Sequence, residues 1–383
     1  MKYVTLKDVC TINMGQSPDS DSYNDNGEGV PFFQGNADFG ERYPVTRKWC
    51  SAPTKMAAPE DILISVRAPI GAMNYAKEEC CIGRGLAALT PDKTKVSPKF
   101  IFWLLKGKNA ELNSKGTGST FKAIGRKVLE ETKVPDIPLE KQLEHSETLE
   151  KIYAVIQHRK SELQMLDDLI KARFVEMFGD PVHSDKYGTR KLSSCVAEKT
   201  DMVDGPFGSQ VNTKIDYIEK GEIPVIRTVN VKKMSFSPVD LKYMTRKKYE
   251  TVIRSQVLPG DVILTKVGTI GNVCVFPDTY KEAVLSTTGS CRIRVDNSIV
   301  NTEFFAYNLL YLKSKLLEIA SAGVQPFLNM NHVKNIDILN VPLGKQTKFA
   351  DFVHQVDKSK VAVQKALDET QMLFDSLMQK YFG

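Results

Sequence analysis

Long apolar runs are missing from this 383-residue chain, and cysteine is sparse. No stretch approaches the roughly 18 consecutive apolar residues of a membrane-spanning helix. The first residues, Met1–Lys7, also lack the apolar segment of a secretory signal peptide. The seven cysteines are odd in number and contain no Cys-x-x-Cys pair, which is typical of reduced, buried thiols rather than of disulfides or zinc ligands. We therefore expect a cytoplasmic protein without membrane association and without a metal of its own.

Signatures of enzymatic chemistry are also absent from the sequence. An adenine methyltransferase needs an Asn/Asp-Pro-Pro-aromatic motif, but the chain has no two consecutive prolines. It has neither a G-x-G-x-x-G loop nor the Gly-Lys-Ser/Thr ending of a phosphate-binding loop. The nearest approach to a nuclease pattern, Pro135-Asp136 with Glu140-Lys141, places its carboxylate and lysine side by side, unlike a spaced metal site. We predict no catalytic residue, no metal ligand and no cofactor in this chain.

Two halves of the chain repeat each other in order and spacing. The phrase Pro138-Leu139-Glu140-Lys141-Gln142 returns as Pro342-Leu343-Gly344-Lys345-Gln346. Phe178-Gly179 returns as Phe382-Gly383, and upstream Pro59-Glu60-Asp61 is echoed by Pro259-Gly260-Asp261. A repeat of this length indicates two copies of one structural unit and predicts internal pseudo-two-fold symmetry.

Each copy begins with a strand-rich part and ends with a long helix. Short apolar runs such as Ile62–Val66 and Val262–Thr265, each after a Pro-x-Asp turn, are typical of strands. Helical spacing appears briefly around residues 98–106 and 301–319. We predict an α+β fold in which residues 1–142 and 181–343 form two strand-rich domains, and residues 143–180 and 344–383 form two long helices.

Both long helices carry an apolar stripe with steps of three and four residues. Such a stripe predicts a coiled-coil seam. We expect the two helices to pair antiparallel, and packing of each helix on its own domain is the alternative. Further apolar residues widen the stripe enough for helices of a partner protein to join. The stripe consists of Leu149, Ile152, Ile156, Leu163, Ile170 and Phe174 in the first helix and Val353, Val356, Leu367 and Phe374 in the second.

The order of these parts resembles the specificity subunit of Type I restriction-modification systems. Val134–Gln142 and Leu339–Gln346 look like that family's junction between recognition domain and helix, and Gly116–Ile124 and Ala322–Ile336 look like the preceding loop and short helix. The resemblance implies a non-catalytic reader of double-stranded DNA, in which each target-recognition domain reads one half of a bipartite, asymmetric site.

The same resemblance implies the partners. The helices would set the spacing between half-sites and hold two methyltransferase subunits and, through them, motor-nuclease restriction subunits. S-adenosylmethionine, ATP and Mg would belong to those partners. A duplicated protein-binding scaffold without DNA recognition is the alternative, and the salt dependence of duplex binding distinguishes the two.

Candidate DNA contacts lie on three pairs of turns at equivalent places, and Arg84 is a further basic candidate for which solvated surface is the alternative. For Arg67 and Lys266, the alternative is an exposed cation paired with a nearby carboxylate. For Asn36 and Asn230, the alternative is ordinary turn formation. In loops 116–122 and 323–329, backbone amides before a helix favour phosphate, and helix capping is the alternative. The predicted contacts are Gln34, Asn36, Arg67, Arg84, Ser119, Lys122, Arg227, Asn230, Lys266, Gln325, Asn329 and Asn331.

Overall fold

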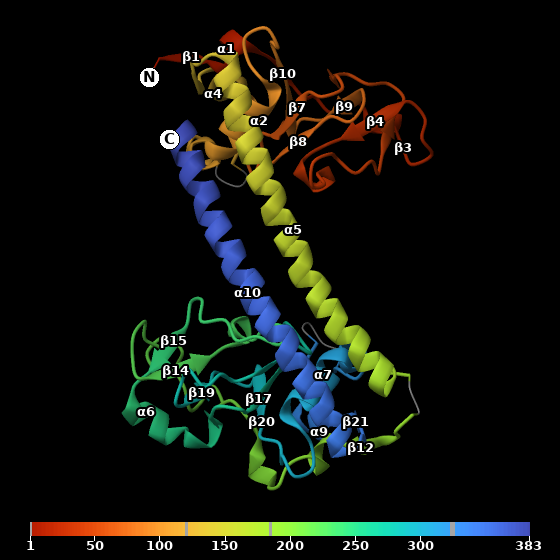
Figure 1. The fold of residues 1–383 in the computed structure, drawn as a ribbon, viewed down its shortest axis with the longest axis vertical. Helices are drawn as coiled ribbons and strands as arrows, with labels where there is room; N and C mark the ends of the chain where they lie inside the picture. The colour runs from red at the N-terminus through yellow and green to blue at the C-terminus, as the bar shows by residue number, and fades with distance from the viewer. Residues whose placement is uncertain (1, 119–121, 184–185, 322–325) are drawn as a thin grey trace. The chain divides into compact units, whose positions relative to one another are not determined.

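The computed structural model describes residues 2–118, 122–183, 186–321 and 326–383, which fall into two compact units. Unit 1 comprises Met1–Ser161 with Val363–Gly383, and unit 2 comprises Glu162–Ala362. Each unit holds one globular domain and parts of both long helices, α5 (Leu139–Phe178) and α10 (Leu343–Phe382) (Figure 1). The predicted α+β class, with two strand-rich domains and two long helices, is confirmed.

The first domain consists of short strands and helices. Its elements are β1 (Tyr3–Thr5), α1 (Leu6–Val9), β2 (Cys10–Met14), η1 (Ser20–Ser22), β3 (Tyr23–Asn24), β4 (Val30–Phe33), η2 (Asn36–Asp38), β5 (Trp49–Cys50), β6 (Met56–Ala57), β7 (Ile62–Ser65), β8 (Met73–Tyr75), β9 (Cys80–Ile82), β10 (Leu86–Pro91), α2 (Pro98–Gly107), α3 (Asn109–Ser114), α4 (Arg126–Glu130) and β11 (Lys133–Pro135).

The second domain repeats this composition. Its elements are β12 (Thr189–Lys191), η3 (Leu192–Ser194), η4 (Lys199–Asp201), β13 (Met202–Asp204), β14 (Ile223–Ile226), η5 (Thr228–Asn230), β15 (Lys242–Met244), α6 (Arg246–Thr251), η6 (Ile253–Ser255), β16 (Gln256–Val257), β17 (Val262–Thr265), β18 (Val273–Val275), β19 (Ala283–Leu285), β20 (Ser290–Ile293), α7 (Thr302–Tyr311), α8 (Lys313–Glu318), α9 (Met330–Lys334) and β21 (Asp337–Leu339).

The two domains share one sheet topology. The central sheet has the order β2-β10-β7-β8 in the first domain and β13-β20-β17-β18 in the second. A second sheet, β5-β4-β9-β6, matches β15-β14-β19-β16, and β3 extends it in the first domain alone. Even the parallel pairing of β4 with β9 recurs as β14 with β19. The predicted duplication is therefore confirmed at the level of strand order.

The aspartate of the duplicated Pro-x-Asp turn stabilises the turn by a hydrogen bond. The buried carboxylate of Asp61 accepts the N–H of Ala58 at 2.8 Å, and that of Asp261 accepts the N–H of Leu258 at 2.7 Å. The central residue of the turn has a positive φ in both copies, 69° at Glu60 and 86° at Gly260. The aspartate thus closes the turn that starts β7 or β17, whose residues are all buried.

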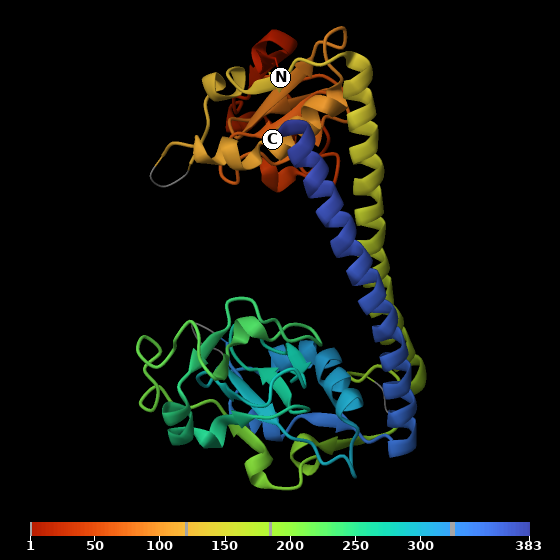
Figure 2. The same ribbon diagram turned by 60° about the vertical axis from the view of Figure 1, so that its left-hand side comes forward.

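The helices α5 and α10 pair antiparallel in each unit. In unit 1, the Arg159 guanidinium donates to the Ala366 carbonyl and to the Thr370 hydroxyl. In unit 2, the ammonium of Lys360 lies 2.7 Å from the carboxylate of Asp167. The ribbons run side by side in both views (Figure 2). The ten stripe residues are all buried except Ile152 and Leu163, which are half-buried.

Both long helices begin directly after the junction proline, which follows the end of the preceding strand by a few residues. The first starts at Leu139 rather than at 143, directly after Pro138, and the second starts at Leu343 after Pro342. Gly179 follows Phe178 with a φ of 85°, and its N–H donates to the Val175 carbonyl at 2.8 Å, as in a left-handed helix C-cap.

The stripe packs on the globular domains as well as on the opposite helix. In unit 2, the Phe174 ring contacts Phe304 of α7 and Phe349 of α10, with centroids 5.7 and 5.3 Å apart. In unit 1, Trp103 of α2 contacts Phe374 of α10 and Tyr153 of α5 at 5.5 and 5.3 Å. From the sequence, packing of the two helices on each other and packing of each helix on its own domain were alternative predictions. The structure has both.

The glutamine of the duplicated phrase fastens each long helix to its domain. The Gln142 Oε1 accepts the N–H of Ser97 at 3.0 Å, and its Nε2 donates to the Ile137 carbonyl at 2.9 Å. The Gln346 amide repeats this with the N–H of Asn301 at 2.8 Å and the Val341 carbonyl at 2.7 Å. Ser97 and Asn301 are the N-caps of α2 and α7. Both glutamines are 2% exposed, so these hydrogen bonds are sheltered from water.

We expect Gln142→Ala to lower the free energy of unfolding by about 2–3 kcal/mol, because it leaves the buried N–H of Ser97 and the carbonyls of Lys95 and Ile137 without their partner. Chemical denaturation followed by circular dichroism measures this. Gln142→Glu keeps the acceptor for Ser97 but buries a carboxylate oxygen against two carbonyl oxygens, so at neutral pH it should destabilise at least as much as Gln142→Ala. Gln355→Ala, an exposed position on α10, is the control and should stay within about 0.5 kcal/mol of the parent. Equal effects at 142 and 355 would contradict the fastening role.

All seven cysteines are buried free thiols. Burial raises the pKa of Cys10, Cys80, Cys274 and Cys291 to about 12, so these thiols stay protonated at neutral pH. Among the described residues, no helix combines the length and hydropathy needed to cross a lipid bilayer. Within the same residues, His, Cys, Asp and Glu side chains form no group of three that could ligate a metal.

Candidate nucleic-acid interface

Several predicted contact residues of the first domain meet where β2, β4, β7 and β9 end. The Gly85 N–H donates to the Gln34 carbonyl at 3.2 Å, and the Gly85 carbonyl accepts the Val66 N–H at 2.9 Å. The Ala68 N–H donates in turn to the Lys122 carbonyl at 3.0 Å. We call this cluster, residues 15–17, 34–36, 66–68, 83–85 and 122–124, the first loop edge.

Three cations project from the first loop edge. The side chains of Arg67, Arg84 and Lys122 are all exposed, and none forms an ion pair or side-chain hydrogen bond within the described residues. Gln34 is exposed beside them, and Asn36 is half-buried. Ser119 lies outside the described residues. The edge thus offers unpaired positive charge together with an amide, the residue types that bind phosphates and base edges.

The second domain forms the same cluster. The Ser286 N–H donates to the Ile226 carbonyl at 2.8 Å, and the Lys266 N–H donates to the Gly289 carbonyl at 2.8 Å. The Leu328 N–H donates to the Lys266 carbonyl at 2.9 Å, as the Ile124 N–H does to Val66. We call residues 205–207, 227–230, 266–268, 286–290 and 327–329 the second loop edge.

A glycine makes the same close approach in both edges. A Cβ on Gly15 would lie 2.1 Å from the Gly83 carbonyl oxygen, and one on Gly205 would lie 2.2 Å from that of Thr287. Since either distance is far below van der Waals contact, the first strand can reach the neighbouring loop only with glycine at this position.

The structure corrects the prediction for Lys266. Its side chain is 3% exposed and forms an ion pair with Asp204, so it cannot contact DNA. The backbone hydrogen bonds match Lys266 with Val66, and the bridges Arg67 to Ala123 and Val267 to Phe327 match Arg67 with Val267. The prediction was thus wrong by one residue, and adjacent side chains of an extended segment point to opposite sides.

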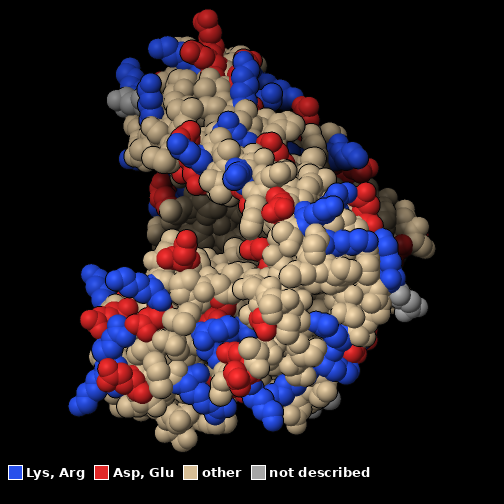
Figure 3. All heavy atoms as spheres, turned by 60° about the horizontal axis from the view of Figure 1, so that its bottom comes forward, with Lys and Arg blue, Asp and Glu red and all other residues tan. Residues whose placement is uncertain are grey.

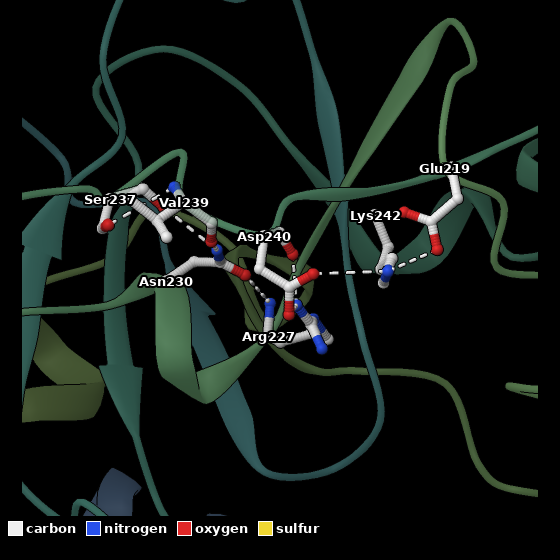
Figure 4. A network of polar contacts seen from close by, with 7 residues as sticks. All are labelled: Glu219, Arg227, Asn230, Ser237, Val239, Asp240 and Lys242. Atoms are coloured by element: carbon white, nitrogen blue, oxygen red, sulfur yellow. Dashed lines mark hydrogen bonds and ion pairs between the residues drawn. The ribbon is translucent and has the colours of Figure 1, made fainter. Parts of the chain in front are cut away.

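Asn230 is also corrected. Its Oδ1 accepts the Arg227 N–H at 3.1 Å, and its Nδ2 donates to the carbonyls of Ser237 and Val239 at 3.0 and 3.1 Å (Figure 4). The residue is fully buried, so its amide closes the turn of η5 and is not available to DNA. Turn formation, the alternative for this asparagine, is what the structure shows.

The side chain of Arg227 is paired with a carboxylate. Its guanidinium donates to the Asp240 carboxylate at 2.8 Å, and Asp240 also lies 3.3 Å from the Lys242 ammonium (Figure 4). Hydrogen bonding from Arg227, followed by that from Lys242, lowers the pKa of the Asp240 carboxyl, which favours its carboxylate form. Lys242 is further paired with Glu219 at 2.6 Å. The carboxylates therefore neutralise the cations of this network.

The third predicted pair of loops, 116–122 and 323–329, lies only partly within the described residues. Asn329 is the N-cap of α9, and its Oδ1 accepts the His332 N–H at 2.9 Å, which is the capping alternative. Asn331 is exposed, and Gln325 lies outside the described residues. Asn329 belongs to the second loop edge, where Phe327 is bridged to Val267.

A groove in the second loop edge was not predicted. It encloses about 370 Å³ and joins three turns. Its lining is Arg227, Thr228, Val229, Val267, Gly268, Ser286, Thr287, Gly289 and Ser290. The hydroxyl-rich run Ser286–Ser290, which aligns with the loop of Arg84, was the sequence signal that could have indicated it.

Charge alone does not outline an interface. On the face drawn in Figure 3, Lys and Arg side chains are interspersed with Asp and Glu. This agrees with the mild net charge of +6. The candidate interface is therefore defined by the clustering of loops.

The same family of known proteins matches each half of the chain. The sequence matches the family described as "Type I restriction modification DNA specificity domain" over residues 1–165 and again over residues 205–370. The putative type I restriction enzyme MjaX specificity subunit of Methanocaldococcus jannaschii is 45% identical over 156 residues, which are 41% of this chain and only 37% of that relative. The type I restriction enzyme EcoBI specificity subunit of Escherichia coli is 20% identical and is matched over 99% of this chain and 85% of its own length.

A solved structure has the same fold over the full length. The Type-I restriction-modification system S subunit from M. genitalium superposes with a TM-score of 0.57 at 16% identity, covering 100% of this chain and 96% of that one. The family match covers most of the sequence and occurs once in each half, where the structure has one copy of the repeated domain. The chain thus belongs to the Type I restriction-modification DNA specificity family and carries its domain in two copies.

Proposed function

We propose that this chain reads a bipartite DNA site, with one loop edge for each half. The observation that carries the proposal is that the two edges share a backbone arrangement but differ in side chains. A shared backbone supports binding to the same kind of surface, a duplex, while different side chains support reading of different bases. The two half-sites should therefore differ in sequence.

We further propose that the long helices hold two methyltransferase subunits, with restriction subunits bound through them. Large apolar side chains are exposed along both helices, more than a solvated helix pair requires. They are Leu139, Leu143, Val155, Met165, Leu169 and Val175 of α5 and Leu343, Val361, Met372 and Leu373 of α10. Catalysis, S-adenosylmethionine, ATP and Mg belong to those subunits in this proposal, and the assembly acts in the cytoplasm.

Duplex binding by the full chain tests the DNA proposal. The site is first selected from a random duplex library, and its affinity is then measured by fluorescence anisotropy over a range of salt concentrations. A DNA reader loses affinity steeply with salt, because phosphate contacts release counterions. A protein-binding scaffold selects no duplex at all, and that result would refute the proposal.

We expect Met165→Glu and Met372→Glu each to weaken assembly with the methyltransferase at least about 10-fold, because each places a charge in an apolar interface. Pull-down and analytical ultracentrifugation of the full complex measure this. Both side chains are exposed, so the thermal midpoint of the isolated chain should not change. Gln355→Glu, also exposed on α10, introduces the same charge as a control. Intact complexes with both variants would refute docking at these positions.

A further inference from the structure

The two loop edges differ in how they present charge. The first edge projects Arg67, Arg84 and Lys122, all exposed and unpaired within the described residues. In the second edge, Arg227 is bound to Asp240 and Lys266 to Asp204. The two cations of the second edge are therefore neutralised by carboxylates, so its ligand contacts must come from other side chains.

Apolar side chains and hydroxyls take the place of those cations. Val229 is 51% exposed on the rim of the groove, and Phe327 is 42% exposed next to it. Val267, which also lines the groove, occupies the position of Arg67. Thr228 and Thr287 line the groove, and their hydroxyls form no hydrogen bond within the part of the chain that the structure describes.

The floor of the groove carries an unused hydroxyl. Ser290 is 2% exposed, and its Oγ lacks a hydrogen-bond partner among the described residues. The strand registers match Ser290 with Leu86, which is fully buried in the first domain. A leucine therefore satisfies the fold at this position. The buried hydroxyl is free to rotate toward a ligand, which is unusual for a group with only a structural role.

We propose that this groove binds thymine in the half-site that the second domain reads. This inference rests on the proposed function and names the base that the second domain would contact. In the major groove, thymine presents a C5-methyl group beside the O4 acceptor. Val229 and Val267 match the methyl group, and the threonine hydroxyls match O4. Guanine is the poorer fit, because it calls for a bidentate arginine fork, and the fork of Arg227 already binds Asp240.

Uracil substitution tests the assignment, because uracil differs from thymine only by the missing methyl group. In the duplex selected by the full chain, each thymine is replaced singly by uracil, and dissociation constants are compared by fluorescence anisotropy. We expect one thymine of one half-site to lose about 4-fold in affinity, the magnitude of one buried methyl group. Val229→Ala should abolish that difference. Val239→Ala, an even more exposed valine outside the groove, and Arg67→Ala should preserve it.

The outcomes separate this inference from the proposed function. Specific, salt-dependent duplex binding without any uracil effect, or a selected site without thymine, overturns the thymine assignment and leaves DNA reading intact. Persistence of the uracil effect in Val229→Ala places the methyl contact elsewhere and also overturns it. Failure of the chain to select any duplex refutes the proposed function itself.

Discussion

Replacing Arg67, Arg84 and Lys122 together with alanine is expected to weaken duplex binding about 100-fold at physiological salt. Each cation that neutralises a phosphate contributes about 0.9 to the slope of log affinity against log salt concentration. Loss of three contacts should therefore lower that slope by about 3. Because all three side chains are exposed and unpaired within the described residues, the fold should not be affected. Anisotropy titrations over a range of salt concentrations measure both quantities.

A matched control carries the same change in net charge. Lys7, Lys93 and Lys95 are exposed in the first domain, before the start of β2 and after the end of β10, which is the opposite end of both strands from the first loop edge. Their triple alanine variant should bind with nearly the parental affinity and slope. If the two triple variants behave alike, the effect is one of overall charge, and the first loop edge is not the binding surface.

Lys266→Val is expected to lower the free energy of unfolding by about 3 kcal/mol, although it introduces the residue that the first domain has at this position. The reason is Asp204, whose half-buried carboxylate loses its ion-pair partner. Breaking a buried ion pair from one side is costly because the remaining charge is uncompensated. Chemical denaturation measures the change.

The first domain supplies the rescue for this variant. The strand registers match Asp204 with Met14 and Lys266 with Val66, so an apolar pair stands where the second domain has an ion pair. The double variant Asp204→Met/Lys266→Val should therefore recover most of the lost stability, since well-packed apolar residues can replace a buried ion pair. If the double variant is less stable than the single one, the ion pair is not the cause of the loss.

The duplicated phrases predicted the fold well because the residues in them have structural roles. Gln142 and Gln346 fasten the helices, and Asp61 and Asp261 close turns, so both pairs recur for reasons that a sequence displays. The apolar stripe likewise predicted the two long helices and their pairing. What it could not reveal was that Trp103 and Phe304 pack onto the same stripe, because a periodic pattern does not identify its partner.

For the candidate interface, the positions of turns were easier to predict than the side chains that face outward. Of the three predicted pairs of turns, which glycine and proline mark, two lie in the loop edges and the third lies partly outside the described residues. Which side chain faces outward depends on a register of one residue, and this reversed the roles of Lys266 and Val267. The groove could not be predicted from one segment, because its walls come from three turns that are far apart in the sequence.

The composition of unit 1 has a consequence for synthesis on the ribosome. Its aromatic core joins residues from distant parts of the chain, with Trp103 against Phe374 and Phe100 against Phe382. Residues 363–383 must therefore leave the exit tunnel before this core can close, whereas unit 2 is continuous from Glu162 to Ala362. The domain made first is thus completed last, because Phe100 and Trp103 of α2 meet their α10 partners only at the end of translation.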